Sequence, residues 1–485
     1  MSTPISSFRR LAGAGLPMLG AVTAVTLCAC TVGPTYRGPP SRDSAPAAFA
    51  SAAPGVTTSS PQDSWWHSFN DPLLDGLIER ALRDNPQLAA AEARVRRSRE
   101  GIVIARAAGI PAANASARVS DDKLSRNGEN LALMPFTPST TEFTDYRVGL
   151  DASWEIDLAG HTRHEIQTAV ARLGSAEETR NDARLVIAAE VATSYVTFRG
   201  ATQRLEIATT RESYTEQALR LVQLQRAAGL VGDAEVLQAV VEQRTATAAV
   251  AAAAGAVEPA LFALVALTGE TVEALRSQLG SAAAVPVAPQ GIPIGLPTDL
   301  LRRRPDIRRA ERDLAGATAA VGAAVAAQFP RLSLVGAAGL DSIRSGDLTS
   351  AASRYWTIAP QLTLPLLAGG RLRSGVRASQ ADLDATVAMY RATVLQAVAE
   401  AESGIVRYGA ARRRIEALEG VASARKAHLL VIRQRHAVGD ISTLELLSAE
   451  RATDDAREQQ LIGSVDLATS FIALSKGLGG GWQQP

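Results

Sequence analysis

The strongest constraint on this fold is an internal duplication. Residues 85–92 (NPQLAAAE) correspond to residues 304–311 (RPDIRRAE), an offset of 219 positions (304 − 85). Two later pairs of segments share an offset of 210 positions (370 − 160 and 439 − 229). Ordered landmarks separated by a single length change indicate two halves of the same topology, and two copies are too few for a solenoid. The later pairs are 158–160 with 368–370, and 229–239 with 439–449.

Each half predicts the order helix, strand, loop, strand, long helix, turn and long helix. Pro86 and Pro305 stand where helices begin readily, and Pro111 and Pro330 are expected to stop those helices. Alternation of apolar and polar residues predicts two strands in each half. The predicted strands are 112–120, 145–156, 331–340 and 354–365, and polar loops at about 121–143 and 342–353 join each pair.

Two proline-free stretches, at 160–228 and 371–438, are rich in helix-forming residues. Each predicts a helix on the order of 100 Å long at 1.5 Å per residue. Such a length exceeds that of helices in globular proteins and favours a coiled coil or a helical barrel. Gly229 and Gly439 occupy the position at which a glycine commonly ends a helix. Return helices are predicted at about 233–267 and 442–476.

The composition excludes several classes of protein. Fifty basic residues against 49 acidic ones leave a net charge of +1, without the basic excess expected of a nucleic-acid-binding protein. A hydrophobic content of 46% is too high for a disordered chain. Only 4% of the residues are aromatic, and abundant alanine favours long, closely packed helices. No catalytic triad, phosphate loop or metal cluster emerges, so neither an enzyme nor a cofactor is expected.

The histidines and cysteines show no spacing typical of a metal site. Cys28 and Cys30 are the two cysteines, and both lie near the N-terminus. His161 and His164 could share one helix face, but no third ligand is evident. For that pair of histidines we expect a solvated helix surface.

The N-terminus is typical of an exported lipoprotein. Two arginines precede the apolar stretch at 11–27, which is too short and too interrupted by glycine and proline to span a membrane convincingly. The following residues, Leu27-Cys28-Ala29-Cys30, resemble a bacterial lipobox, which predicts N-acyl and diacylglycerol lipid on Cys30. The alternative is an ordinary signal peptide with incidental cysteines. Thr31 after the cysteine favours sorting to the outer membrane, and several acyl chains would hold the protein firmly there.

The predicted domain organisation follows from these features. We expect a lipoprotein signal peptide and then an acylated tether that is rich in proline, serine and alanine between about 38 and 64. Two repeats and a short tail complete the chain. The predicted boundaries are 1–29 for the signal peptide, 30–70 for the tether, 71–285 and 286–480 for the repeats, and 481–485 for the tail.

Four strands cannot close a barrel, and lipid does not tolerate open sheet edges. A membrane barrel would therefore need several chains. Three chains supply twelve strands, an even number within the range known for outer-membrane barrels. The long helices would continue such a barrel as a helical tube.

Three segments carry a resemblance to a known family. They are residues 30–39 (CTVGPTYRGP), 296–308 (LPTDLLRRRPDIR) and 322–334, with GAA at its start and FPRLSL at its end. They resemble the lipoprotein branch of the TolC-like outer-membrane efflux channels, over essentially all of residues 30–480. The resemblance implies a mainly α homotrimer, with a twelve-stranded outer-membrane β-barrel joined to a periplasmic α-helical barrel. It also implies a periplasmic adaptor and an inner-membrane pump, commonly of the resistance-nodulation-division type.

This family forms passive exit ducts for drugs and other small toxic compounds. Related possibilities are a channel for type I protein secretion and a channel for metal efflux. A structural coiled-coil lipoprotein would lack the alternating strands, and an enzyme would need a catalytic set that this sequence does not present.

The resemblance further implies an acidic gate where the helices turn at the periplasmic end. The family's acids lie six and nine positions after the turn glycine, and the sixth positions here are Glu235 and Glu445. The ninth positions are Gln238 and Ser448, so a second acidic ring is missing. Rings of carboxylates in a narrow opening would attract cations and repel anions.

Helix capping is the alternative role for these acids. Ser442-Thr443-Leu444-Glu445 is also a capping box, so gate and cap remain equally open for Glu445. A cap is less favoured for Glu235, because the corresponding cap position is Gly232. Asp233 and Asp440 are either gate residues or acids that the helix dipole favours, and Arg226 and Arg435 are their candidate ion-pair partners.

The same turns are the expected docking surface for the adaptor. Apolar residues are unusual at a solvent-facing tip, although burial between neighbouring hairpins would also explain them. The tip residues are Gly229, Leu230, Val231, Gly439 and Ile441. Trp65 and Trp66 could lie at a membrane interface or pack beneath the helices, and the sequence does not decide between the two.

Overall fold

The computed structural model describes residues 31–39, 46, 48–51, 56–59, 61–125, 140–280, 283–289 and 291–482. These residues form two compact units, and each unit takes segments from both halves of the chain. The first holds the described residues up to Gly38 together with those of Arg96–Gly174 and Arg312–Ala388. The second holds those of Pro39–Val95, of Ser175–Glu311 and from Met389 onwards. Cys28, Cys30 and the loop at 126–139 lie outside the described residues.

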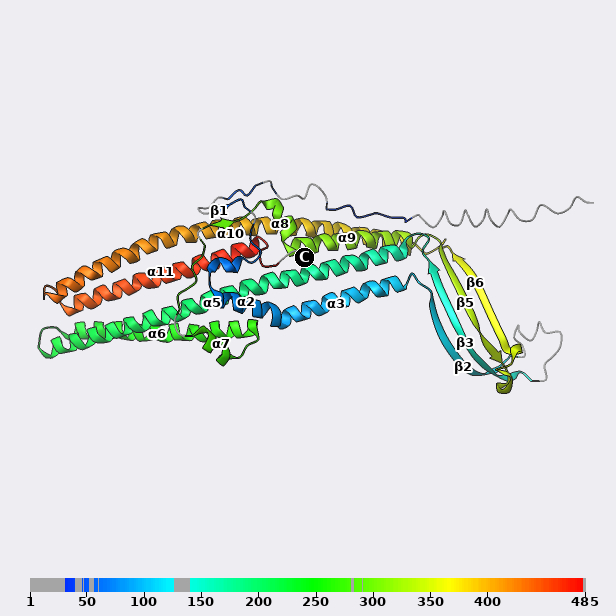
Figure 1. The fold of residues 1–485 in the computed structure, drawn as a ribbon, viewed down its shortest axis with the longest axis horizontal. Coiled ribbons are helices and arrows are strands. Elements are labelled where there is room, and N and C mark those ends of the chain that lie inside the picture. The colour runs from blue at the N-terminus through cyan, green and yellow to red at the C-terminus, as the bar shows by residue number, and fades with distance from the viewer. Residues whose placement is uncertain are drawn as a thin grey trace, which may run out of the picture. The chain divides into compact units, whose positions relative to one another are not determined.

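The first unit contains a four-stranded antiparallel sheet in the order β2-β3-β5-β6 (Figure 1). All four predicted strands are confirmed to within a few residues. Their bounds are Ala112–Lys123 for β2, Glu142–Ile156 for β3, Arg331–Ser342 for β5 and Arg354–Thr363 for β6. Two short 3-10 turns, η3 (Ser345–Asp347) and η4 (Ala351–Ser353), lie in the loop between β5 and β6. β2 and β6 are the edges of this sheet and have no second strand partner among the described residues.

The sheet has one apolar face. Residues directly opposite each other in neighbouring strands project from the same side of a sheet. The register therefore gathers apolar side chains from all four strands on one side. Two of these cross-strand rows are Ala115, Leu150, Ala338 and Trp356, and Ala117, Val148 and Leu340.

The opposite face of the sheet is polar and carries charge. Arg147 forms an ion pair with Asp341 at 2.6 Å and lies over the ring of Tyr355. On the same face, Ser116 donates a hydrogen bond to Asp151 at 3.0 Å. One apolar and one polar face are what a barrel strand needs when lipid lies outside it and water inside.

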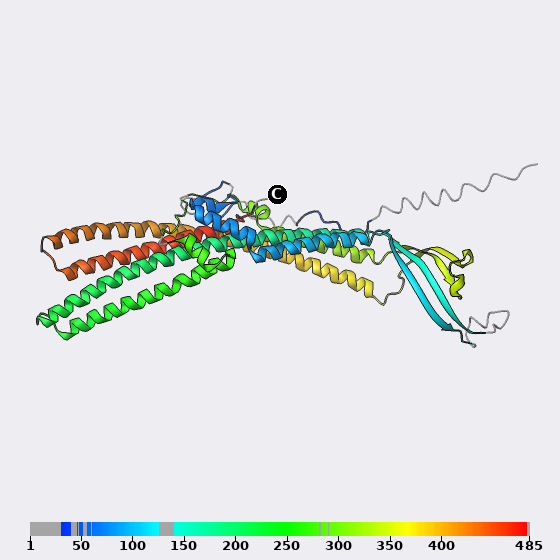
Figure 2. The same cartoon turned by 60° about the horizontal axis from the view of Figure 1, so that its bottom comes forward.

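The long helices confirm the duplication. α5 (His161–Ala227) and α10 (Arg371–Ala437) each contain 67 residues. Each turns back into a shorter helix, α6 (Asp233–Thr268) after α5 and α11 (Thr443–Gly477) after α10, so that two helical hairpins form (Figure 2).

The helices before the strands begin at the predicted prolines. α3 runs over Pro86–Ala107 and α9 over Pro305–Ala326. Both stop four residues before Pro111 and Pro330, because a tight turn already closes each end: Gly109 N–H donates to the carbonyl of Arg106, and Gln328 N–H to that of Val325, both at 3.0 Å. The prolines therefore mark the start of the strands rather than the last turn of the helices.

Several short elements were not predicted from the sequence. They are the 3-10 turn η2 (Trp65–Phe69), the helices α2 (Pro72–Asp84), α7 (Val272–Leu279) and α8 (Pro297–Arg303), and a parallel pair of two-residue strands, β1 (Val56–Thr57) and β4 (Ile292–Pro293). All of them belong to the second unit.

Trp65 and Trp66 lie in the hydrophobic core of the second unit. Trp65 and Trp66 are buried, and their rings meet edge to face with centroids 5.7 Å apart. Trp65 also contacts Phe471 of α11, at 5.9 Å between ring centroids. Both tryptophans therefore pack beneath the helices and lie within the hydrophobic core.

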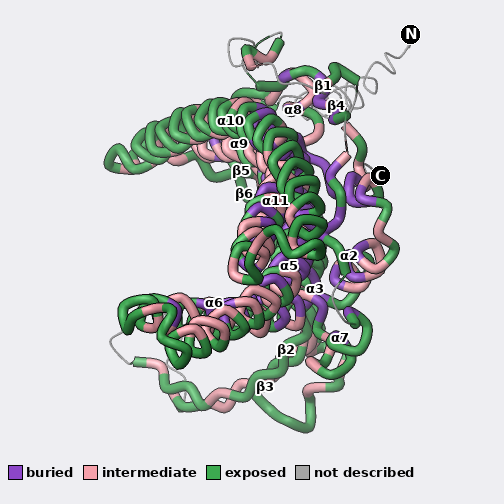
Figure 3. Tube along the Cα trace, turned by 90° about the vertical axis from the view of Figure 1, so that its left-hand side faces the viewer, coloured by how far each residue is buried: buried purple, intermediate pink, exposed green. Residues whose placement is uncertain are grey.

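Many residues of α6 and α10 are exposed, between buried and intermediate ones (Figure 3). Among the described residues, α6 alone is long and apolar enough to cross a membrane by composition, and only 22% of its most apolar 18-residue window is buried. Its exposed large apolar residues include Leu237, Val241 and Phe262, and those of α10 include Val421, Leu430 and Val431. Apolar helix surfaces of this extent are expected to be covered by another copy or a partner.

We predict that Leu150→Arg prevents stable insertion of the sheet, whereas Ser153→Arg on the opposite face of the same strand is tolerated. An arginine facing lipid near mid-bilayer costs about 2–4 kcal/mol. The measurement is the yield of heat-modifiable trimer in outer-membrane fractions. Equal yields from the two variants would contradict the assignment of the faces.

Candidate functional site

The two hairpin tips close with the same backbone geometry. Gly229 and Gly439 both adopt left-handed φ values, of 74° and 80°. After each glycine the next amide reaches back into the helix: Leu230 N–H donates to the Gln225 carbonyl at 2.9 Å, and Asp440 N–H to the Arg435 carbonyl at 3.0 Å. A residue with a Cβ is strained at such a φ, so glycine is required at both turns.

Glu445 caps the start of α11. Its backbone N–H donates to Ser442 Oγ at 3.2 Å, and its carboxylate accepts from Ser442 N–H at 3.1 Å. This is a complete capping box. The capping alternative for Glu445 is therefore realised in this structure, and a role at the gate would be additional to it.

Glu235 forms one of the two hydrogen bonds of a capping box at the start of α6. Its carboxylate accepts from Gly232 N–H at 3.0 Å, while glycine has no side chain with which to return the bond. As expected from the glycine at position 232, this cap is weaker than that of Glu445, because one of its two bonds is missing. The carboxylate alone satisfies an otherwise free donor at the start of α6.

Ion pairs hold the acids that begin the return helices. Arg226 contacts Asp233 at 2.6 Å, and Arg435 contacts Asp440 at 2.6 Å, which confirms the predicted partners. The hydrogen bond from the Arg226 guanidinium, and then its charge, holds the pKa of Asp233 below its usual value. Both aspartates are thus engaged within their own tips.

A cavity of about 440 Å³ lies between the two hairpins and brings three of the predicted gate residues together. These are Glu235, Gln238 and Ser448. Leu444 and Leu447 supply apolar walls. Glu445, Asp233 and Asp440 do not line this cavity, so the structure separates the proposed gate residues into two groups.

Sequence reasoning missed the ion pair that bridges the hairpins beside this cavity. Arg451 of α11 contacts Glu242 of α6. Burial raises the pKa of Glu242, but hydrogen bonds from Arg451 and Gln238 outweigh it and leave the pKa lowered. The sequence offered one signal for this pair. Glu242 and Arg451 each follow a turn glycine by little more than three helical turns, so they occupy similar positions in the two return helices.

A second ion-pair cluster joins the same hairpins further from the tips. Arg204 and Arg211 of α5 contact Glu458 of α11 at 2.7 and 2.8 Å, and Arg211 also reaches Asp455 at 2.9 Å. Two arginines on one half-buried carboxylate lower the pKa of Glu458 against the effect of burial. Separating the hairpins would break these contacts together with that of Arg451.

The predicted docking residues differ in exposure. Leu230 is 74% exposed at the first tip, while Val231 and Ile441 are half-buried. Val438, which the sequence analysis overlooked although it directly precedes Gly439, is 80% exposed. Each tip thus presents one prominent apolar side chain to solvent, next to the turn glycine.

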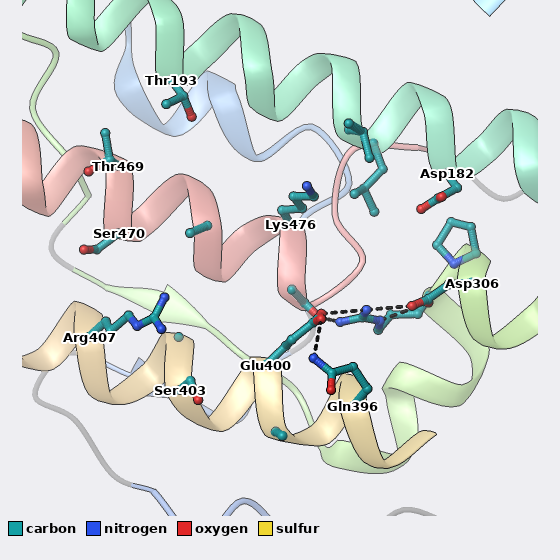
Figure 4. A pocket seen from close by; sticks show the side chains of 18 residues that line it. Asp182, Thr193, Asp306, Gln396, Glu400, Ser403, Arg407, Thr469, Ser470 and Lys476 are labelled. Carbon is teal, nitrogen blue, oxygen red and sulfur yellow. Dashed lines mark hydrogen bonds and ion pairs between the residues drawn. The ribbon is translucent and has the colours of Figure 1, made fainter. Parts of the chain in front are cut away.

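The sequence signature at 296–308 organises a different region of the second unit. Arg304 there bonds to Asp306 at 2.7 Å and to Glu400 of α10 at 2.8 Å, and donates to the Gly477 carbonyl that ends α11 at 2.9 Å. These residues line a cavity of about 860 Å³ whose wall also includes Asp182 (Figure 4). The signature arginine therefore joins α9, α10 and α11.

The first unit holds the described N-terminal segment. Val32 N–H donates to the Ala159 carbonyl at 3.0 Å, and the carbonyl of Val32 bonds to Nε2 of His164 at 2.8 Å. Arg163 donates to Oγ1 of Thr31 at 2.8 Å. His164 is only 2% exposed, so the predicted solvated face was wrong for this histidine, because the N-terminal segment covers it.

The described residues contain no group of three or more His, Cys, Asp or Glu side chains arranged to hold a metal ion. The charged side chains at the tips serve as caps and ion-pair partners instead. The tips present carboxylates and apolar side chains at the ends of the two hairpins.

Comparison with known proteins identifies the family. The family model described as "Outer membrane efflux protein" matches residues 77–270 and 296–480. The chain is 30% identical over 470 residues to outer membrane protein OprJ of Pseudomonas aeruginosa, covering 95% of each protein. It is 31% identical over 416 residues to the solvent efflux pump outer membrane protein SrpC of Pseudomonas putida, covering 85% of this chain and 86% of that protein.

Solved structures show the same fold. The outer-membrane channel OprN superimposes with a TM-score of 0.83 at 32% identity, covering 94% of this chain and all of that one. The Campylobacter jejuni CmeC outer membrane channel gives a TM-score of 0.83 at 23% identity, covering 94% of this chain and 96% of that one. These proteins are channels rather than enzymes. The duplicated halves, the four-stranded sheet and the matches over nearly the whole chain together place this protein in the outer membrane efflux protein family.

Proposed function

We propose that three copies of this chain form the outer-membrane exit duct of a tripartite efflux pump for drugs, solvents or other small toxic compounds. The observation that carries the proposal is the four-stranded sheet with one apolar face and two edges that no other described strand pairs. Lipid does not tolerate unpaired backbone groups, so each edge must pair with the sheet of another copy. Three sheets make twelve strands, which is a number that can close.

The helices support the same assembly. The exposed apolar surfaces of α6 and α10 lie on different halves of the chain. The α6 surface of one copy would contact the α10 surface of the next copy. A head-to-tail contact of this type closes a ring. Alanine-rich α6 allows a neighbouring helix to approach closely.

The names of the relatives favour small molecules as the transported class. The matched proteins include a solvent efflux pump component and an antibiotic efflux pump component of Pseudomonas putida. We assign the partners accordingly: a periplasmic adaptor, docked at Leu230 and Val438 of the tips, and an inner-membrane pump of the resistance-nodulation-division type. Protein secretion and metal efflux are the competing outcomes of the test.

Deleting the gene should sensitise cells to drugs or organic solvents, and the intact chain should restore tolerance. The measurement is growth across a panel of drugs, solvents and metal salts. Sensitivity to metal salts alone would favour metal efflux instead. Loss of a secreted protein with unchanged drug and solvent tolerance would contradict the proposed function and favour protein secretion.

We further propose that Glu235 and Glu445 form carboxylate rings at the periplasmic opening of the trimer. Both lie at the third position of a return helix and at the same distance from the turn glycine. Glu235 also lines the cavity between the hairpins with Gln238 and Ser448. Opening would separate hairpins that Arg451 and Glu242 now join. Asp233 and Asp440 would add charge near the opening.

The double variant Glu235→Gln and Glu445→Gln should raise the conductance of single channels in planar bilayers and weaken block by divalent cations. The reason is that the substitutions remove six carboxylates from the narrow opening of the trimer. The control Glu216→Gln with Glu419→Gln removes the same charge from the shafts of α5 and α10 and should change neither property. Ser442→Ala breaks the cap of α11 while keeping the charge of Glu445. If Ser442→Ala reproduced the double variant, the effect would come from the cap of α11; if the double variant matched wild type, both glutamates would be caps only.

We propose that Cys30 carries the lipid anchor. The described segment that follows it is held against the start of α5, at Arg163 and His164. An anchor attached there would lie where the chain leaves the sheet. Several acyl chains give stable attachment where one chain alone does not.

Cys30→Ala should abolish incorporation of labelled palmitate and still allow trimers to form, because the sheet and helices do not depend on the lipid. Cys28→Ala is the matched control and should remain labelled if Cys28 leaves with the signal peptide. Persistent labelling of Cys30→Ala would refute the site.

A further inference from the structure

A group of arginines stands where the second half of the chain leaves the sheet. Arg371, Arg373 and Arg377 lie in the first two turns of α10, and all three are exposed. The first turn of α10 holds no acidic residue. Within the described part of the chain, no ion pair engages any of the three, and Arg377 donates only to Ser374 Oγ, at 3.1 Å.

An apolar segment leads directly into these arginines. Leu362 is the last large apolar residue of β6, and it lies beside Leu332 of β5 on the apolar face of the sheet. Leu364 and Leu366 keep the same alternation beyond the strand. Leu366 and Leu367 are 81% and 100% exposed. The apolar face of the sheet therefore continues into exposed leucines up to the glycine turn before α10.

The equivalent point in the first half of the chain shows which segment lies at this end of the sheet. The register aligns Ile156, at the end of β3, with Leu332 and Leu362, so α5 and α10 start from the same end of the sheet. Arg163 of α5 is the duplicate of Arg373, at the offset of 210 positions (373 − 163). Arg163 bonds to Thr31, the residue that follows the proposed lipid anchor. The equivalent position in the second half holds no such segment among the described residues.

We propose that Arg371, Arg373 and Arg377, with Leu366 and Leu367, form a binding surface for an anionic phospholipid of the periplasmic leaflet. We call these five residues the arginine–leucine surface. It rests on the proposed function in one respect only, namely that the sheet spans the outer membrane. The guanidinium groups bind the phosphate and the anionic headgroup, and the two leucines enter the acyl-chain region.

The chemistry of the arginine–leucine surface favours a phospholipid over the other candidates. Arginine binds phosphate through two parallel N–H donors, which gives geometry as well as charge complementarity. A soluble anion would explain the arginines but not the exposed leucines beside them. Because the apolar face of the sheet already requires lipid, the leucines extend an interface that the fold itself provides. Each trimer would carry three such surfaces.

The test uses the purified full-length trimer. Wild-type protein is placed in nanodiscs of phosphatidylcholine alone or with 30% phosphatidylglycerol, and the temperature at which the trimer dissociates is measured on gels. Lipid retained after detergent purification is counted by native mass spectrometry. We expect a higher dissociation temperature and retained anionic lipid in the wild type, both reduced by high salt.

Three variants make the test specific. Arg371→Gln with Arg373→Gln and Arg377→Gln should lower affinity for anionic lipid on the order of fivefold per arginine, the contribution of one basic residue near an anionic surface. The matching triple lysine variant should keep most of the affinity. The control Arg413→Gln with Arg425→Gln and Lys426→Gln removes three positive charges from exposed positions further along α10 and should bind as the wild type does.

Several outcomes would overturn the proposal. They are equal stability of the wild type in both nanodiscs, unchanged lipid binding in the triple glutamine variant, and an equal loss in the control variant. Stabilisation in detergent by inorganic phosphate at the same charge concentration would show a simple anion site instead of a lipid surface. Channel conductance of the triple glutamine variant should persist, so failure of this inference can be told from failure of the proposed function.

Discussion

The sheet's unpaired edges are the constraint on which the rest of the structure depends. A backbone group that enters lipid without a hydrogen-bond partner costs several kcal/mol, and β2 and β6 each present a row of such groups among the described residues. A chain with four strands cannot remove both edges by itself. In the assembly proposed above, other copies pair these edges, and the duplication gives the two halves equivalent strands, helices and turns. Such an assembly would repeat similar contacts around the ring, within a chain and between chains.

The contacts between the two helical hairpins include charged side chains. The helices of both hairpins contribute to the hydrophobic core, for example through Leu261 of α6 and Phe471 of α11, and ion pairs add to these contacts. Arg211 with Glu458 and Arg451 with Glu242 connect the first hairpin to the second. Pairs of this kind are individually weak when exposed to water, whereas these two are partly buried. Under the proposed function, opening would exchange these contacts between the hairpins for contacts with a partner.

Much of the fold was predictable because its signals are local. Proline at helix starts, glycine at the turns and alternation in the strands each act over a few residues, and the duplication confirmed each signal with a second copy. The four strands and the long helices were found to within a few residues. The short elements α2, α7 and α8, and the pair β1 with β4, were missed, although α2 and α7 carry local signals in the caps that Asp71 and Thr271 provide. The burial of His164 was missed because the covering segment lies more than a hundred residues away in the chain.

The sequence by itself determined the two-fold topology, the amphipathic strands and the positions of Gly229 and Gly439, since each depends on neighbouring residues. Only the tertiary structure decided which side chains meet. It separated Glu445, which caps its own helix, from Glu235, Gln238 and Ser448, which share a cavity between hairpins. It also showed Arg304 joining three helices. Contacts between residues far apart in the chain depend on how helices pack, and no local pattern encodes that packing.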